Sequence, residues 1–120
     1  AYTDPLTGLR NRRWFRERVE SRLLGWRLST DRPERHTGDY CVLMLLDIDH
    51  FKAINDRHGH DGGDDVLKAV GERLKHCLRS GDEVIRWGGE EFLLALVGGT
   101  TRDAERLAAR VLGVLAEPLI

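Results

Sequence analysis

The apolar positions along this chain change their spacing from segment to segment, and each spacing predicts a different element. In residues 11–28, Phe15, Val19, Leu23 and Trp26 recur at intervals of three or four. Side chains at that interval lie on one face of an α-helix, so this segment is predicted to be an amphipathic helix with one apolar side.

A continuous apolar run at residues 40–46 has the length of a strand and leads directly into Asp47. Because the run is apolar at successive positions, it suits a central strand that is covered on both faces. The segments at residues 29–39 and 55–63 are polar and contain Gly, and in the first case Pro, so both are expected to be loops.

Two further helices are predicted in the second half of the chain. The first opens at Asp64 or Asp65, and residues 80–82, which contain a Gly, end it. The last helix runs toward the end of the chain. Their apolar stripes consist of Val66, Leu67, Val70, Leu74 and Leu78 in the first and Ala104, Leu107, Ala108, Val111 and Leu115 in the second.

A β-hairpin is predicted between these two helices. Short strands at residues 83–87 and 90–97 flank the pair Gly88 and Gly89. Two glycines between apolar runs favour a tight hairpin turn, because the common two-residue turns need positive φ.

The resulting order is helix, strand, helix, strand, strand, helix. It is the order of a ferredoxin-like or palm-type βαββαβ unit, an α/β (α+β) fold, with its final strand missing. At 120 residues the chain is expected to be one domain, residues 1–120, that is incomplete at its C-terminus. Without that outer strand, the sheet is expected to expose an edge that favours association.

Composition narrows the possible partners. With 19 basic and 20 acidic residues, the chain has no global field that would attract DNA, RNA or an anionic membrane. Its longest apolar run, residues 41–46, is far too short for a membrane segment. Cys41 and Cys77 each lie in an apolar pattern, which favours two buried free thiols over a disulfide and therefore a reducing, cytoplasmic location.

Four carboxylates are expected near one edge of the sheet. Asp47 and Asp49 follow the first strand and share a face if that strand continues through Asp49. Glu90 and Glu91 are adjacent at the mouth of the hairpin, so at most one of them is expected squarely beside Asp47, unless the turn twists them. Carboxylates that gather raise one another's pKa values, and a hard divalent cation such as Mg²⁺ (or Mn²⁺) on a nucleotide triphosphate relieves the repulsion. The alternative is that they only cap and solubilise strand ends.

Other phosphate and metal motifs fit less well. An EF-hand loop would need a ligand where Phe51 stands and a glycine where Lys52 stands, and no Walker-type glycine-rich loop occurs. His58 and His60 lack a third clear nitrogen or sulfur ligand for zinc. Phosphates would therefore be held by metal, by loop backbone and by Lys52.

Four short motifs follow one another along the chain: DPLTGLRNRR at residues 4–13, LDIDHFKAIND at 46–56, GHDGGD at 59–64 and RWGGEEF at 86–92. Together they resemble the successive signatures of the GGDEF family of diguanylate cyclases. The resemblance implies that two GTP molecules are condensed into cyclic di-GMP and two pyrophosphates, by attack of a 3′-hydroxyl on an α-phosphate. It also implies a homodimer, because one such domain binds one GTP.

The resemblance implies a metal and catalytic set. Asp47 and Glu90 resemble the family's metal ligands, together with the backbone carbonyl of Ile48. Lys52 resembles the residue that stabilises charge at the transferring phosphate. Glu90 also counts as catalytic, and Glu91 is expected to help in metal binding or in proton removal.

The resemblance also implies two nucleotide-binding sets. Asn55 and Asp64 look like the guanine-binding pair, and His60 and Phe51 are expected to line the substrate pocket. An allosteric site for cyclic di-GMP as product inhibitor is predicted at positions that match the family's register: Arg79, Asp82, Arg86 and Arg110.

Two other functions remain open at this point. The chain could belong to a catalytically silent module that senses GTP or cyclic di-GMP, or to another palm-like nucleotidyl transferase or cyclase with the same metal chemistry. Because the chain stops at Ile120, before the family's closing strand and basic phosphate-contacting residues, the fragment itself is expected to be weakly active or inactive.

Overall fold

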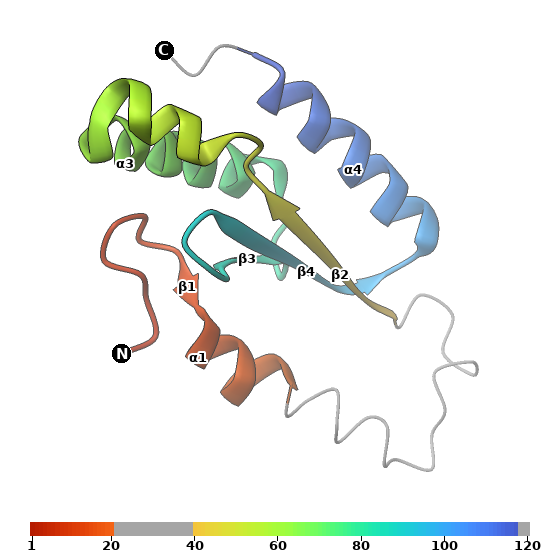
Figure 1. Cartoon of the computed structure of the whole chain (residues 1–120). Helices are drawn as coiled ribbons and strands as arrows, with labels where there is room; N and C mark the ends of the chain where they lie inside the picture. The colour runs from red at the N-terminus through yellow and green to blue at the C-terminus, as the bar shows by residue number, and fades with distance from the viewer. Residues whose placement is uncertain (21–39, 118–120) are drawn as a thin grey trace.

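The structure is a computed structural model of the chain, and it describes residues 1–20 and 40–117. In these residues one mixed sheet has the strand order β1-β3-β4-β2 (Figure 1). β1 pairs parallel with β3, and the other two pairings are antiparallel. The strands are β1 (Arg10–Asn11), β2 (Tyr40–Asp47), β3 (Glu83–Arg86) and β4 (Glu91–Gly99). The α/β fold class is therefore confirmed.

Helices lie on both faces of this sheet. Figure 1 shows α3 (Phe51–Cys77) and α4 (Thr101–Leu115) on one side. On the other side α1 (Arg12–Trp14) continues into the π-helical turn η1 (Phe15–Glu20). The helix predicted at residues 11–28 is thus helical through Glu20, and its remainder, the loop at 29–39 and the side chain of Cys41 lie outside the described residues.

The alternation of β4 supplies both halves of the core. Leu94 and Leu96 point toward α3 and α4, where they pack with Leu74 and Leu107. Leu93 and Ala95 point to the other face, where they pack with Phe15 and Ile85. Because successive strand residues alternate in direction, this one strand links two apolar clusters across the sheet. No described helix has the length and apolar character needed to cross a bilayer.

The prediction that residues 40–46 form a central strand is wrong in one respect. β2 is a strand, but it lies at the edge of the described sheet and pairs only with β4. Leu43 and Leu45 are 46% and 56% exposed, whereas Val42, Met44 and Leu46 pack against the core. In a βαββαβ unit the last strand pairs with the first, so the edge of β2 is where a further strand of that unit would pair.

The loop predicted at residues 55–63 is also wrong. The chain is helical from Phe51, and the helix is interrupted only at Gly59, where φ is 78° and ψ is 172°. A single residue in this conformation redirects the helix, and only glycine adopts it without strain. The apolar stripe beyond it is confirmed at Leu67, Val70 and Leu74, which are buried.

The hairpin is confirmed, but its turn differs from the prediction. Residues 87–90 form a four-residue connection, closed by the Trp87 N–H, which donates to the Glu91 carbonyl at 2.9 Å. Neither Gly88 nor Gly89 has positive φ, so this is not a two-residue primed turn. Longer connections of this kind are built mostly from ordinary right-handed turn conformations. Consequently Glu90 belongs to the turn and not to β4.

Candidate functional site

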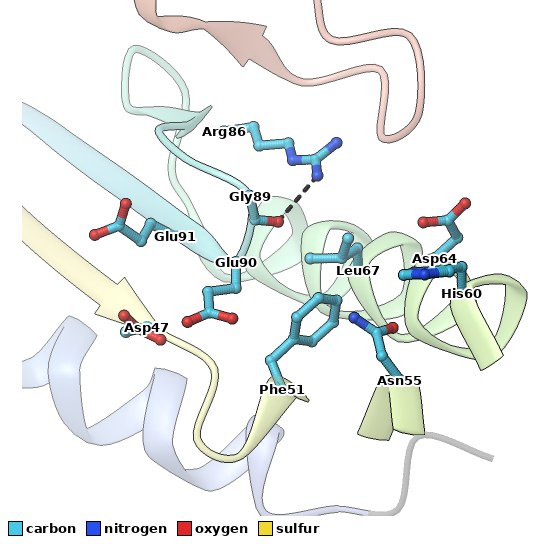
Figure 2. Close-up of a pocket in the computed structure, with 10 residues that line it drawn as sticks. All are labelled: Asp47, Phe51, Asn55, His60, Asp64, Leu67, Arg86, Gly89, Glu90 and Glu91. Carbon is cyan, nitrogen blue, oxygen red and sulfur yellow. Dashed lines mark hydrogen bonds between the residues drawn. The ribbon is translucent and has the colours of Figure 1, made fainter. Parts of the chain in front are cut away.

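A cavity of about 590 Å³ opens where the hairpin turn and the end of β2 face α3 (Figure 2). Its size is typical of sites that hold a small molecule. The lining residues are Asp47, Phe51, Asn55, His60, Asp64, Leu67, Arg86, Gly89, Glu90 and Glu91. Most of the residues predicted to bind metal or substrate are thus brought to one place.

Strand pairing brings the carboxylates together. Asp47, the last residue of β2, is opposite Glu91, the first residue of β4. One residue further on, the Ile48 N–H donates to the Glu90 carbonyl at 3.1 Å. Asp47 and Asp49 were expected to share a face only if the strand continued through Asp49. The strand ends at Asp47 and Asp49 lies in a turn, so this requirement is not met.

The side chain of Glu90 is directed toward Asp47 (Figure 2), and Glu91 is the residue that pairs with Asp47 across the two strands and also lines the cavity. Because Glu90 belongs to the turn and not to β4, the strand alternation that predicted at most one glutamate beside Asp47 does not apply to this pair. The pKa of Glu90 is raised above its ordinary value by partial desolvation, by repulsion from Asp47 together with a hydrogen bond to it, and by Glu91. No Lys, Arg or His in the described parts of the chain forms an ion pair with these three carboxylates.

The oxygen atoms of Asp47 and Glu90 suit a hard divalent cation that also keeps water and phosphate ligands better than they suit a metal held entirely by protein side chains. Among residues 1–20 and 40–117, no three His, Cys, Asp or Glu side chains stand close enough to hold a metal by themselves. Mg²⁺, however, is usually bound through one or two carboxylates, with further oxygen ligands from water and substrate phosphates. Asp47 and Glu90, with the Ile48 backbone carbonyl nearby, are suited to that mode of binding.

The opposite wall of the cavity comes from the two halves of α3. Phe51 and Asn55 lie before the break at Gly59, and His60 and Asp64 lie after it (Figure 2). Asn55 and Asp64 are half-buried, and His60 is exposed. An amide and a carboxylate on one wall offer both donors and acceptors to a planar base.

Arg86 lies in this cavity, although the sequence pattern assigned it to the product site. Its Nη1 is 3.1 Å from both carboxylate oxygens of Asp4, and its Nη2 donates to the Gly89 carbonyl at 2.9 Å. Burial alone would raise the pKa of Asp4, but hydrogen bonds from Thr7 and Arg86 hold it below its ordinary value. Arg86 therefore joins the N-terminal turn to the hairpin turn, which no local sequence signal indicated.

Lys52 and Ile48 do not line the cavity. Lys52 is exposed on the first turn of α3, and Ile48 is half-buried beside the core. Leu67 and Gly89 line the cavity without having been predicted. Leu67 was recognisable only as a core residue, because its apolar side chain also belongs to the buried stripe of α3.

Of the other residues predicted for the product site, Arg79 and Asp82 lie between α3 and β3, and Arg110 lies on α4. The Nε of Arg79 is 3.5 Å from the Asp82 carboxylate, and its Nη1 is 3.9 Å from that of Asp103. Arg110 lies close enough to Cys77 to oppose the effect of burial, which raises the pKa of that thiol. We call Arg79, Asp82 and Asp103 the Arg79 cluster. It contains the predicted Arg-Asp pair and one carboxylate that was not predicted.

Comparison with known proteins agrees with this fold. Residues 1–118 match the family described as "Diguanylate cyclase, GGDEF domain". The chain belongs to this family.

Among characterised relatives, it is 42% identical to the diguanylate cyclase DgcP of Pseudomonas aeruginosa over 116 residues, which are 97% of this chain and 16% of that protein. It is 40% identical to the response regulator PleD of Caulobacter vibrioides, over 92% of this chain and 23% of that protein. The chain thus spans less than a quarter of the length of either relative.

Solved structures show the same fold. A sensory box/GGDEF family protein from Caulobacter crescentus matches with a TM-score of 0.81 and 32% identity, over 98% of this chain and 72% of that one. The GGDEF domain of DgcB from Caulobacter crescentus, solved in complex with c-di-GMP, matches with a TM-score of 0.74 and 29% identity, over 92% of this chain and 58% of that one.

Proposed function

We propose that the GGDEF domain to which this chain belongs is a diguanylate cyclase that uses Mg²⁺ (or Mn²⁺). The supporting observation is a single cavity with two unlike walls. One carries the Asp47 and Glu90 carboxylates without a cationic partner among the described residues, and the other carries Asn55 and Asp64. The first suits a cation with phosphates, and the second suits guanine.

In this proposal each wall holds one part of GTP. Asp64 accepts the N1 and N2 hydrogens of guanine, and Asn55 meets another edge of the base. Asp47, Glu90 and the Ile48 carbonyl would hold the cation, which when bound neutralises charge that develops on the phosphates. Lys52, exposed at the start of α3, supplies a further positive charge at the transferring phosphate.

The reaction needs two such domains. The 3′-oxygen of one GTP attacks the α-phosphorus of the other, the bond to the β-phosphate oxygen breaks, and pyrophosphate leaves. Glu90 or Glu91 takes the proton of the attacking hydroxyl. Because the cavity has one base-binding wall, the second GTP must be bound by a second copy of the domain. The ring closes when the 3′-oxygen of the second nucleotide attacks the α-phosphorus of the first and the second pyrophosphate leaves. A homodimer holds the two nucleotides at a high effective concentration.

We further propose that cyclic di-GMP, the product, binds at the Arg79 cluster with Arg110 and inhibits the reaction. The guanidinium fork of Arg79 can meet both phosphate and guanine, and Asp82 can accept from guanine. Arg86 is engaged by Asp4 inside the cavity, so it is left out of this site. GTP as substrate and the buried free thiol of Cys77 favour a cytoplasmic location.

The test is to incubate a protein that contains the complete domain with GTP and Mg²⁺ and to identify the product by mass spectrometry. Cyclic di-GMP and pyrophosphate are expected with GTP, and no cyclic product with ATP. Equal turnover of ATP would favour another nucleotidyl transferase. Binding of GTP without any turnover would favour a silent sensory module.

A further inference from the structure

The base-binding wall depends on a close contact at Gly63, in the second half of α3. Gly63 is buried. A Cβ atom added there would lie 1.8 Å from Asn55 Oδ1 and 2.9 Å from Asn55 Cγ, and also 3.2 Å from Phe51 Cζ. The first two distances are far below van der Waals contact. Even a methyl group at residue 63 therefore requires the Asn55 side chain to move.

Backbone conformation does not explain this glycine. Gly59 needs its left-handed φ of 78°, but Gly63 has no positive φ and continues the helix. Glycine in a helix interior is unfavourable relative to alanine, because it loses more backbone freedom on folding. Gly113 in α4 is a useful contrast, since an added Cβ there meets nothing within 4 Å. The requirement at Gly63 is the space that the Asn55 carboxamide occupies.

This contact joins the two halves of α3 at the place where both contribute to the cavity. Asn55 comes from the half before Gly59, and Asp64 follows Gly63 directly in the half after it. The carboxamide of Asn55 lies against the backbone at Gly63, so its position relative to Asp64 is set by direct contact. A carboxamide has one donor end and one acceptor end, and a small displacement changes which one faces a ligand.

We propose that Gly63 is a specificity-determining positioning residue. The space left by the absent side chain lets the Asn55 amide lie in register with Asp64, so that Asn55 and Asp64 together select guanine over adenine. This inference rests on the proposed function, because it takes GTP as the ligand of the cavity. It adds a residue that does not itself line the cavity.

The test compares Gly63→Ala with Gly113→Ala, the same substitution in a helix at a site with open space. GTP and ATP are titrated separately into each variant and into the unmutated chain, with Mg²⁺ present, by calorimetry. Gly63→Ala is expected to weaken GTP binding by roughly 10–100-fold while ATP binding stays the same, as for loss of a bidentate base contact. Gly113→Ala is expected to match the unmutated chain. A purely structural role of Gly63 would lower the melting temperature and leave the GTP-to-ATP preference intact, which would overturn the proposal.

A double variant separates this contact from general damage to the helix. In an Asn55→Ala background the amide is gone, so adding Gly63→Ala is expected to change GTP affinity by less than about twofold. If the single variant does not fold, the double variant is expected to fold and to bind GTP like Asn55→Ala. Additive losses, or a double variant that does not fold, would contradict the proposal. An unmutated chain without preference for GTP would instead contradict the proposed function.

Discussion

Charged side chains gather at two opposite ends of this sheet, and they are balanced in different ways. At the hairpin end, Asp47 and Glu90 lie together without a cationic partner among the described residues. At the other end, before β3 and after β4, the carboxylates of Asp82 and Asp103 both face Arg79. The first group has no cationic partner among the described residues, whereas the second group shares one arginine within the chain.

The pKa shifts express the same difference. The pKa of Glu90 is raised, by desolvation and by its acidic neighbours. The pKa of Asp103 is lowered, first by hydrogen bonds from the backbone and side chain of Thr100 and then by nearby arginines. Acidic residues alone therefore do not indicate a site. What distinguishes the cavity is that its acidic residues lack internal compensation.

The largest effect is expected from removing charge in the cavity. In a protein with the complete domain, Asp47→Asn or Glu90→Gln should lower turnover by at least about a thousandfold, because a neutral amide replaces a charged ligand worth several kcal/mol to the transition state. Steady-state rates of cyclic di-GMP formation measure this effect. Glu105→Gln, an exposed charge on α4, is the matched control and should be silent. Unchanged rates in both cavity variants would remove the proposed cation site.

Loss of base contacts should have a smaller effect. Asn55→Ala and Asp64→Ala should each weaken GTP binding by roughly 1–3 kcal/mol, by analogy with one lost bidentate base contact. Calorimetric titration with GTP measures the change. Asp65→Ala is the control, because its exposed side chain is next to Asp64 but does not line the cavity. If Asp65→Ala weakens binding as much as Asp64→Ala, base recognition by Asp64 is wrong.

At the Arg79 cluster, loss of the arginine should affect cyclic di-GMP binding more than it affects stability. Arg79→Ala should weaken cyclic di-GMP binding by about tenfold or more, through loss of the guanidinium fork. The free energy of unfolding should change by no more than about 1 kcal/mol, because the ion pairs of this half-exposed arginine are screened by solvent. Titration of cyclic di-GMP and denaturant unfolding measure the two quantities, with Arg102→Ala as control. Equal affinity in Arg79→Ala and the unmutated protein would leave the cluster as ordinary surface charge.

The smallest effects concern the pH dependence of the free energy of unfolding. The contributions of Glu90, at the hairpin end, and Asp103, at the other end, should change with pH in opposite directions. Glu90 binds its proton more tightly in the folded state, so its contribution to the free energy of unfolding falls as pH rises from about 4.5 through the raised folded pKa. Asp103 has a lowered folded pKa, so its contribution is present above 3.8 and is lost as pH falls through the folded value.

Urea unfolding across this pH range can separate the two contributions. Glu90→Gln should be more stable than the unmutated chain at neutral pH and lose that advantage below about pH 4.5. Asp103→Asn should be less stable at neutral pH, with the difference shrinking at low pH. The same sign for both variants would mean that the two groups of carboxylates are not balanced differently.

The parts of the fold that depend on local spacing could be predicted from the sequence. The strand that begins at Tyr40, the buried stripe at Leu67 and Leu74, and the helix around Leu107 each follow from a pattern within a few residues. The edge position of β2 could not be predicted in this way, because it depends on pairing with β4, some fifty residues later.

Glycines account for most of the remaining differences. Gly59, Gly62 and Gly63 together favour a loop, but in the fold the first redirects a helix and the third makes room for Asn55. The cavity residues were predicted from motifs in register, and strand pairing explains why Asp47, Glu90 and Glu91 meet. The engagement of Arg86 by Asp4 joins residues 82 positions apart, and no local pattern carries that information.

The most direct test of the account is the affinity for GTP with Mg²⁺ and after chelation, in the unmutated chain and in an Asp47→Asn/Glu90→Gln variant. We predict that the unmutated chain binds GTP well only with Mg²⁺, because its carboxylates otherwise repel the phosphates. In the variant the dependence on Mg²⁺ should largely disappear. Equal affinity of the unmutated chain with and without Mg²⁺ would contradict the claim that Asp47 and Glu90 are completed by a cation.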